Sequence, residues 1–208
     1  MRWGMPQPDD ANGCEQGVRF GQPEQSIVNY GSERCVYLPD GRCRLYLYRR
    51  TEGSDPEDYC IISATSTDSS PLPTFVQDPG VRIAQRPFPV GAPLGTAYTP
   101  DVMWCEAEGY YRMYYSAWTD EELLGPRGYI MAATSQDGLE WHLSNGGQPI
   151  MYPGGPWDRV KCSNPSVIEL PDGRARLFIE ACDGSAEGLF GVWRISSQTS
   201  VVPRGAAL

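Results

Sequence analysis

The chain contains one histidine and one lysine, His142 and Lys161, and no long apolar run. Because the histidine stands next to a tryptophan that we interpret as structural, the sequence offers no Ser-His-Asp or Cys-His catalytic arrangement. The seven cysteines include no Cys-x-x-Cys pair, so metal-site spacing is missing and we expect no metal and no cofactor. A membrane span would need about 18 consecutive apolar residues, and no such stretch exists.

Positive charge is also scarce, since 17 Lys and Arg residues face 26 Asp and Glu residues, for a formal net charge of −9. Phosphate binding needs a cationic surface, so nucleic acid is excluded as a partner, whereas neutral, cationic or sugar-like ligands remain open. The N-terminus lacks the apolar core of a signal peptide. Most cysteines lie in apolar segments with a strand-like pattern, so we expect reduced, buried thiols and a cytoplasmic location.

Turn formers and aromatics are abundant, with 23 Gly, 19 Pro, 12 Tyr and 6 Trp among 208 residues. Such a composition favours short strands joined by tight turns. Three segments repeat one pattern, in which an apolar strand, a turn ending in glycine and an alternating strand follow one another. They are "SERCVYLPDGRCRLYLYRR" (32–50), "PDVMWCEAEGYYRMYYSAW" (100–118) and "NPSVIELPDGRARLFIEAC" (164–182), with turn glycines Gly41, Gly109 and Gly173. The spacing predicts three β-hairpins.

Each hairpin is followed by a further strand, which the pattern places at 60–68, 129–137 and 189–197. Fourth strands are predicted near 80–84 and 147–152, and "TDEELLGPRG" (119–128) is predicted to be a loop. A four-stranded antiparallel unit that recurs about every 65 residues predicts an all-β protein of the β-propeller class. We expect an irregular segment at 1–24, a propeller domain at 25–200 and a flexible tail at 201–208, with blades near 32–85, 97–152 and 160–200.

Three blades leave sheet edges whose backbone N–H and C=O groups have no partner strand. We therefore expect a partial propeller, or one that is completed by the termini or by a partner chain, as in a homo-oligomer.

Three segments of the sequence resemble the five-bladed β-propeller glycoside hydrolases, a group of arabinanases, β-xylosidases, invertases and β-mannoside phosphorylases. "YTPDVMWCEAEGYYRMYYSAW" is similar to the second-blade signature of the arabinanase and xylosidase branch. "ATSQDGLEW" is similar to the Ser-x-Asp-Gly-x-x-Trp blade motif, and "KCSNPSVIELPDGRARLF" resembles the third blade. The likeness runs from roughly 25 to 197, and it implies action on glycosidic bonds by converging carboxylates.

The resemblance implies roles for particular acids. Asp101 matches the aspartate that orients and tunes, and Glu33 is the acid aligned with the first-blade base, although the family has Asp-Pro where this chain reads "GSERC". The general acid has no match, because the third blade begins "KCSNP", with Ser163 and Asn164 where acids would stand. Glu180 and Asp183, after the third hairpin, are the candidates that could substitute for it.

Each of these residues also has a structural interpretation. Asp101 and Glu33 would then cap or end strands, and Asn164 would close a strand end instead of binding a sugar hydroxyl. Trp104 and Trp118 flank the Asp101 hairpin, where they either stack on sugar faces or fill the blade. We interpret Asp137, Gly138 and Trp141 as a structural turn with its packed aromatic.

The sequence thus predicts a glycoside hydrolase-like protein with an oligosaccharide ligand. The alternatives are a non-catalytic carbohydrate-binding propeller and a propeller enzyme adapted to another small molecule.

Overall fold

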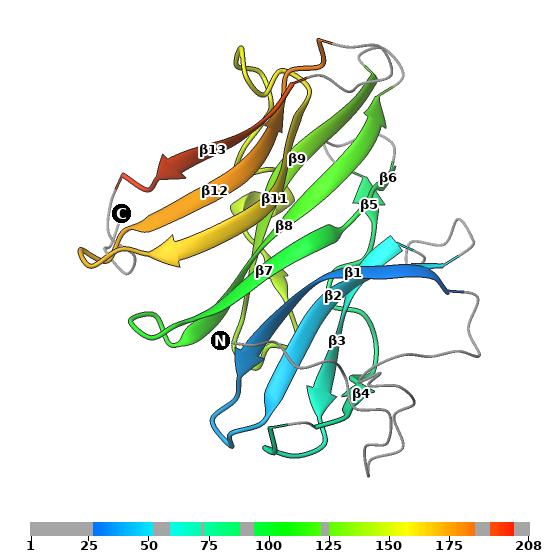
Figure 1. The fold of residues 1–208 in the computed structure, drawn as a ribbon, viewed down its shortest axis with the longest axis vertical. Helices are drawn as coiled ribbons and strands as arrows, with labels where there is room; N and C mark the ends of the chain where they lie inside the picture. Colours follow the sequence, from blue (N-terminus) through cyan, green and yellow to red (C-terminus); the bar gives the residue numbers. More distant parts are fainter. Residues whose placement is uncertain are drawn as a thin grey trace, which may run out of the picture.

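The computed structural model describes residues 27–51, 59–71, 73–87, 94–121, 125–185 and 192–201. The predicted segment 1–24 and all but the first residue of the predicted tail lie outside these ranges. The strands form three antiparallel groups that lie side by side (Figure 1), which confirms the predicted all-β class and its four-stranded units. Within the described ranges, no helix has the length and apolar character to cross a membrane.

The first group contains the strands β1 to β4 in sequence order. Their bounds are β1 (Ile27–Tyr37), β2 (Cys43–Thr51), β3 (Tyr59–Ser66) and β4 (Phe75–Gln77). The β1–β2 turn has the chemistry that its sequence predicts: Gly41 takes a positive φ of 84°, and the backbone N–H of Arg42 donates to Asp40 Oδ1. Both features tighten the turn without strain.

The second group repeats this arrangement, with β7 to β10 again in sequence order. Its strands are β7 (Tyr98–Cys105), β8 (Tyr110–Glu121), β9 (Gly125–Ser135) and β10 (His142–Leu143), followed by a short 3-10 turn, η2 (Asn145–Gly147). A small ribbon of β5 (Arg86–Pro87) and β6 (Leu94–Gly95) precedes it.

The third group holds β11 (Lys161–Glu169), β12 (Ala175–Cys182) and β13 (Trp193–Thr199). One parallel pairing, between Lys161 and Gly128, joins it to the second group. On its edge strand β13, the Ile195 side chain is 73% exposed. The expectation that termini or a partner chain complete the ring stays a prediction.

Two predictions about individual segments are wrong, namely the loop at 119–128 and the positions of the fourth strands. Segment 119–128 is not a loop, because β8 and β9 continue to pair as far as Glu121 with Gly125; backbone hydrogen bonding outweighs the turn-forming composition at the hairpin end. The fourth strands lie at β4 and β10, before the predicted segments. Those segments contribute only single bridges, from Ile83 to Ile61 and from Met151 to Ile130.

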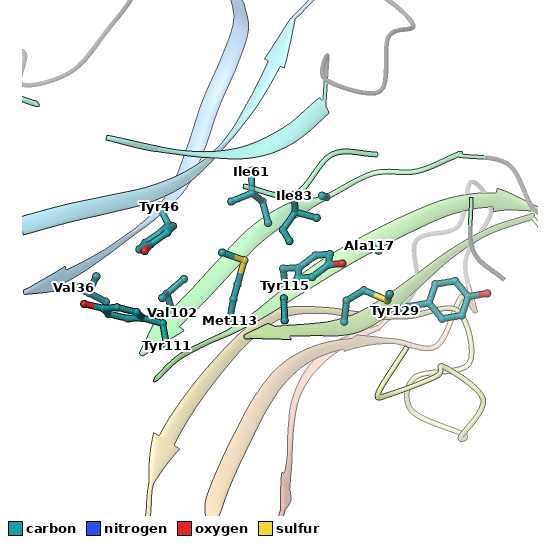
Figure 2. Packing of buried hydrophobic residues seen from close by; sticks show 13 residues of the cluster. Val36, Tyr46, Ile61, Ile83, Val102, Tyr111, Met113, Tyr115, Ala117 and Tyr129 are labelled. Atoms are coloured by element: carbon teal, nitrogen blue, oxygen red, sulfur yellow. The ribbon is translucent and has the colours of Figure 1, made fainter. Parts of the chain in front are cut away.

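The main core lies between the first and second groups, where side chains of β2 and β3 meet those of β7 to β9 (Figure 2). Large fully buried members come from both sides: Tyr46, Ile61, Met113, Tyr115 and Met131. A smaller cluster of Ile130, Met151, Cys162 and Ile179 joins the second group to the third. Neighbouring groups are therefore held together by apolar burial between sheet faces. This packing fixes the positions of β1, β7 and β11, the first strand of each group, which we call the inner strands.

The thiols follow the prediction in part. None of the six cysteines in the described ranges forms a disulfide, and Cys60, Cys105, Cys162 and Cys182 are buried. The prediction of burial is wrong for Cys35, which is exposed, and for the half-buried Cys43. These two lie near the turn of the β1–β2 hairpin, where strand alternation turns one face to solvent.

The "SQDG" turn after β9 is held by the first group. Asp137 Oδ1 accepts backbone N–H bonds from Leu139 and Glu140, at 2.8 and 2.9 Å. From the first group, Arg44 Nη1 donates to the Asp137 carbonyl at 2.7 Å, and the Tyr46 hydroxyl donates to the Gly138 carbonyl at 2.8 Å. The contacts agree with the structural interpretation of this motif.

We expect Gly138→Ala to lower the free energy of unfolding by roughly 2–4 kcal/mol, measured by urea denaturation. Gly138 has a φ of 74°, and an added Cβ would collide with the Tyr46 hydroxyl and lie 2.7 Å from Arg44 Nη1. Gly109→Ala is the matched control, because Gly109 has a φ of 69° with nothing within 4 Å of its added Cβ. Equal losses of stability in the two variants would contradict the close packing of Tyr46 and Arg44 against the "SQDG" turn.

Candidate functional site at the heads of the inner strands

The three inner strands carry the same irregularity near their starts. The pairing register shifts between Gly31 and Arg34 in β1, between Tyr98 and Asp101 in β7, and between Ser163 and Ser166 in β11. In each bulge one residue other than glycine has positive φ, namely Ser32 at 53°, Thr99 at 48° and Asn164 at 49°. Conformations of this kind are costly and gather at functional sites. Since β7 lies between β1 and β11 and contacts both (Figure 1), we take the region of these three bulges as the candidate site.

Asp101 is the first residue after the β7 bulge, and its side chain is 9% exposed. Arg34 Nε of β1 lies 2.7 Å from Asp101 Oδ1, and the backbone N–H of Val167 in β11 donates to Oδ2. The carboxylate therefore ties all three inner strands together. Both carboxylate oxygens are thereby engaged, which suits a residue that orients its neighbours.

A set of mixed aromatic, amide and charged side chains lies beside these bulges, and we call it the head cluster: Tyr98, Trp118, Lys161, Asn164, Glu180 and Trp193. Its members come from β7, β8, β11, β12 and β13.

The lysine ammonium occupies the centre of the aromatic part of the head cluster. Lys161 Nζ lies 4.3 Å from the ring centroid of Trp118, 5.1 Å from that of Trp193 and 5.7 Å from that of Tyr98. Its stem passes over Gly128, where a Cβ would overlap Lys161 Cγ. Burial lowers the pKa of the ammonium, and the negative charge of Glu180 partly offsets that shift. Cation–π attraction to three rings holds the charge in place.

A chain of hydrogen bonds links the polar members to the bulges. Ser116 Oγ accepts from the Thr99 hydroxyl at 2.6 Å and from the backbone N–H of Asn164 at 2.8 Å. The Asn164 amide in turn donates to Glu180 Oε2 at 2.6 Å. The Glu180 carboxylate is thus oriented by the strained backbone of β11, and the Asn164 amide bonds to only one of its two oxygens.

The structure brings only some of the predicted site residues together. Trp118, Asn164 and Glu180 belong to the head cluster, and Asp101 lies on the adjoining strand segment. Glu33 is exposed within the β1 bulge, and the residue that corresponds to Asp101 after that bulge is Arg34. A role for Glu33 as a base stays a prediction.

Trp104 lies apart from the head cluster. It pairs with Tyr111 near the β7–β8 turn, whereas Trp118 lies seven residues further along β8. At about 3.4 Å per residue, that separation is about 24 Å along the strand. The two tryptophans therefore stand at opposite ends of one hairpin and cannot contact one sugar ring together.

Lys161, Tyr98 and Trp193 were not predicted as site residues. Lys161 had a signal, because it is the only lysine of the chain and directly precedes "CSNP". Tyr98 and Trp193 had no such sequence signal, because aromatic residues in strands are common in hydrophobic cores. In the described ranges, His, Cys, Asp and Glu side chains nowhere form a set of three that could hold a metal ion.

Solved structures share this fold. A thermostable family 43 glycoside hydrolase matches with a TM-score of 0.66 and 17% identity, over 88% of this chain and 57% of its own. An N-acetylgalactosamine deacetylase from F. plautii matches at 0.64 and 15%, over 88% and 52%. A family 117 glycoside hydrolase from the marine bacterium Zobellia galactanivorans matches at 0.61 and 19%, over 85% and 52%. No family model and no curated protein matches the chain.

The resemblance to propeller glycoside hydrolases is therefore confirmed at the level of the fold. The chain spans about half the length of these structures. At identities of 15–19%, the likeness identifies an architecture, and function has to be argued from the site.

Proposed function

We propose that this chain is glycoside hydrolase-like, that its head cluster binds an oligosaccharide, and that Glu180 acts on the glycosidic bond. The observation that carries the proposal is the convergence, beside three strained bulges, of two tryptophan rings with an amide-oriented carboxylate. Flat aromatic faces bind the apolar faces of sugar rings, and polar groups beside them read the hydroxyls. The deacetylase that shares the fold holds a blood group B trisaccharide, which supports a ligand of this class.

The residues of the site divide the chemistry among them. Cleavage of a glycosidic bond needs a proton on the leaving oxygen and negative charge near the oxocarbenium-like centre. Glu180 would give the proton, with its second oxygen held by the Asn164 amide. Asp101 is a positioning residue, because its bonds to Arg34 and Val167 set the inner strands relative to one another. Glu33, exposed on the neighbouring bulge, is the second carboxylate of the proposal.

One observation favours binding without hydrolysis as the second candidate. Both oxygens of Asp101 are engaged, one of them by the Arg34 cation at the position where a paired carboxylate would be expected. The head cluster would then hold an oligosaccharide through stacking and hydrogen bonds alone.

Trp118→Ala is expected to weaken oligosaccharide binding by about tenfold or more, because a stacking face is lost and the Lys161 ammonium loses its nearest ring. Calorimetric titration with xylotriose, arabinotriose and blood group B trisaccharide measures the change. Tyr37→Ala is the matched control, since this aromatic side chain is 79% exposed on the first group. Undiminished affinity in Trp118→Ala would refute the head cluster as the binding site, whichever of the two candidate functions holds.

A further inference from the structure

We propose that the seam between the first and second strand groups carries a second carbohydrate-binding site, centred on Trp104 and separate from the head cluster. A cavity of about 350 Å³ opens there between the β1–β2 turn and the "SQDG" turn after β9. Its lining includes Asp40, Arg44, Trp104, Tyr111, Gln136 and Asp137. The site lies at the turn end of the hairpins, whereas the head cluster lies at the other end of β8.

The Trp104 ring is exposed and held in one orientation. It is 41% exposed, which is unusual for so large an apolar side chain. Its indole N–H donates to Glu106 Oε2 at 2.7 Å, and its ring meets Tyr111 at 4.9 Å between centroids with an interplanar angle of 64°. The exposed part of the ring is accessible to a ligand in the cavity that Trp104 lines. A pre-oriented aromatic face loses little entropy when a ligand stacks on it.

Groups that can bind hydroxyls stand beside this ring. Gln136 is exposed and lines the cavity, and in the described part of the chain its amide makes no hydrogen bond or ion pair, so its donor and its acceptor are available to a ligand. Asp137 uses Oδ1 for the bonds from Ser135, Leu139 and Glu140, which leaves Oδ2 for a ligand. An amide and a carboxylate next to an aromatic face are the groups that hold vicinal sugar hydroxyls.

These polar groups are rigid because the turn that carries them is pinned. Arg44, 8% exposed, donates to the Asp137 carbonyl and pairs with Asp78 at 3.4 Å. Tyr46 holds the next carbonyl, that of Gly138. The first group thus supplies one wall of the cavity and also fixes the other wall, so that the site exists only where the two groups meet.

Size and charge select the ligand class. Ligand sites span roughly 300–1,000 Å³, so a cavity of about 350 Å³ suits one sugar ring and little more. Two carboxylates line it against one guanidinium, and that guanidinium is already bonded within the protein. An anionic sugar is therefore disfavoured, and we assign a neutral monosaccharide unit, free or at the end of a longer glycan.

The test follows the indole N–H signal of Trp104 in ¹H–¹⁵N spectra of the full chain, assigned with Trp104→Phe. Methyl xyloside, methyl galactoside and methyl glucoside are the neutral probes, and methyl glucuronide and tetramethylammonium are the charged comparators. We expect a saturable shift with at least one neutral probe at millimolar concentration. Trp104→Ala should weaken binding at the seam by about tenfold and Gln136→Ala by about threefold. Trp157→Ala is the control and should leave binding unchanged, because Trp157 is exposed and lies against Arg194 of the third group.

Xylotriose binding at the head cluster should be the same in Trp104→Ala as in the wild type, so failure of the seam site and failure of the proposed function give different results. Absence of a Trp104 shift with every neutral probe would overturn the proposal. Tighter binding of glucuronide or of tetramethylammonium would overturn the assigned ligand class. Because Gln136 is exposed and contributes no internal bond, its variant keeps the test valid even where Trp104→Ala fails to fold.

Discussion

Replacing Glu180 with glutamine is expected to lower the rate of xylotriose hydrolysis by about 10²–10⁴-fold while oligosaccharide affinity stays close to that of the wild type. Glutamine keeps the shape of the side chain and an oxygen that accepts from the Asn164 amide, but it has no proton to give. Release of xylose from xylotriose measures the rate, and calorimetry measures the affinity. The loss should be smaller with p-nitrophenyl glycosides, because p-nitrophenolate departs with little protonation.

Glu169→Gln is the matched control, because Glu169 is an exposed acid at the end of β11. It should leave both rate and affinity unchanged. Hydrolysis at the wild-type rate in Glu180→Gln would remove Glu180 from the chemistry. If the wild type binds xylotriose and hydrolyses none of the tested glycosides, the non-hydrolytic candidate replaces the first one.

Asp101→Ala is expected to lower the free energy of unfolding by roughly 2–4 kcal/mol, which urea denaturation measures. The substitution leaves the Val167 N–H without its acceptor and the Arg34 guanidinium without its counter-charge. Because the Arg34 side chain is 43% exposed, solvent screens part of the ionic loss. Asp101→Asn should cost less, since the amide oxygen still accepts from Val167.

The control for Asp101 is Asp172→Ala, which breaks an exposed ion pair with Arg174. It should change stability far less, because both partners remain hydrated in a surface turn. A loss in Asp101→Ala no larger than that in Asp172→Ala would show that Asp101 does not tie the inner strands together.

The hairpins and the repeat could be predicted because their signals are local. Gly41, Gly109 and Gly173 all take positive φ at the predicted turns, and a turn glycine requires only its neighbours in sequence to be recognised. The "SQDG" turn was recognisable for the same reason. Its anchoring by Arg44 and Tyr46 was not, since more than 90 residues separate the partners.

The candidate site could be predicted only in part, because a β-bulge changes which residues face one another. After the β1 bulge, Arg34 occupies the register position that Asp101 occupies after the β7 bulge, one residue beyond Glu33. Trp104 and Trp118 flank the same hairpin in sequence, yet antiparallel pairing sends them to opposite ends. Lys161 of β11 acquires its role only when β7, β8 and β13 bring three rings around it.

The most direct test of the central claim is the calorimetric titration of xylotriose, arabinotriose and blood group B trisaccharide into the wild type and Trp118→Ala. The head cluster predicts saturable binding of at least one of them by the wild type and a loss of about tenfold or more in the variant. Binding that is equal in the two proteins, or no binding of any of the three, would contradict it.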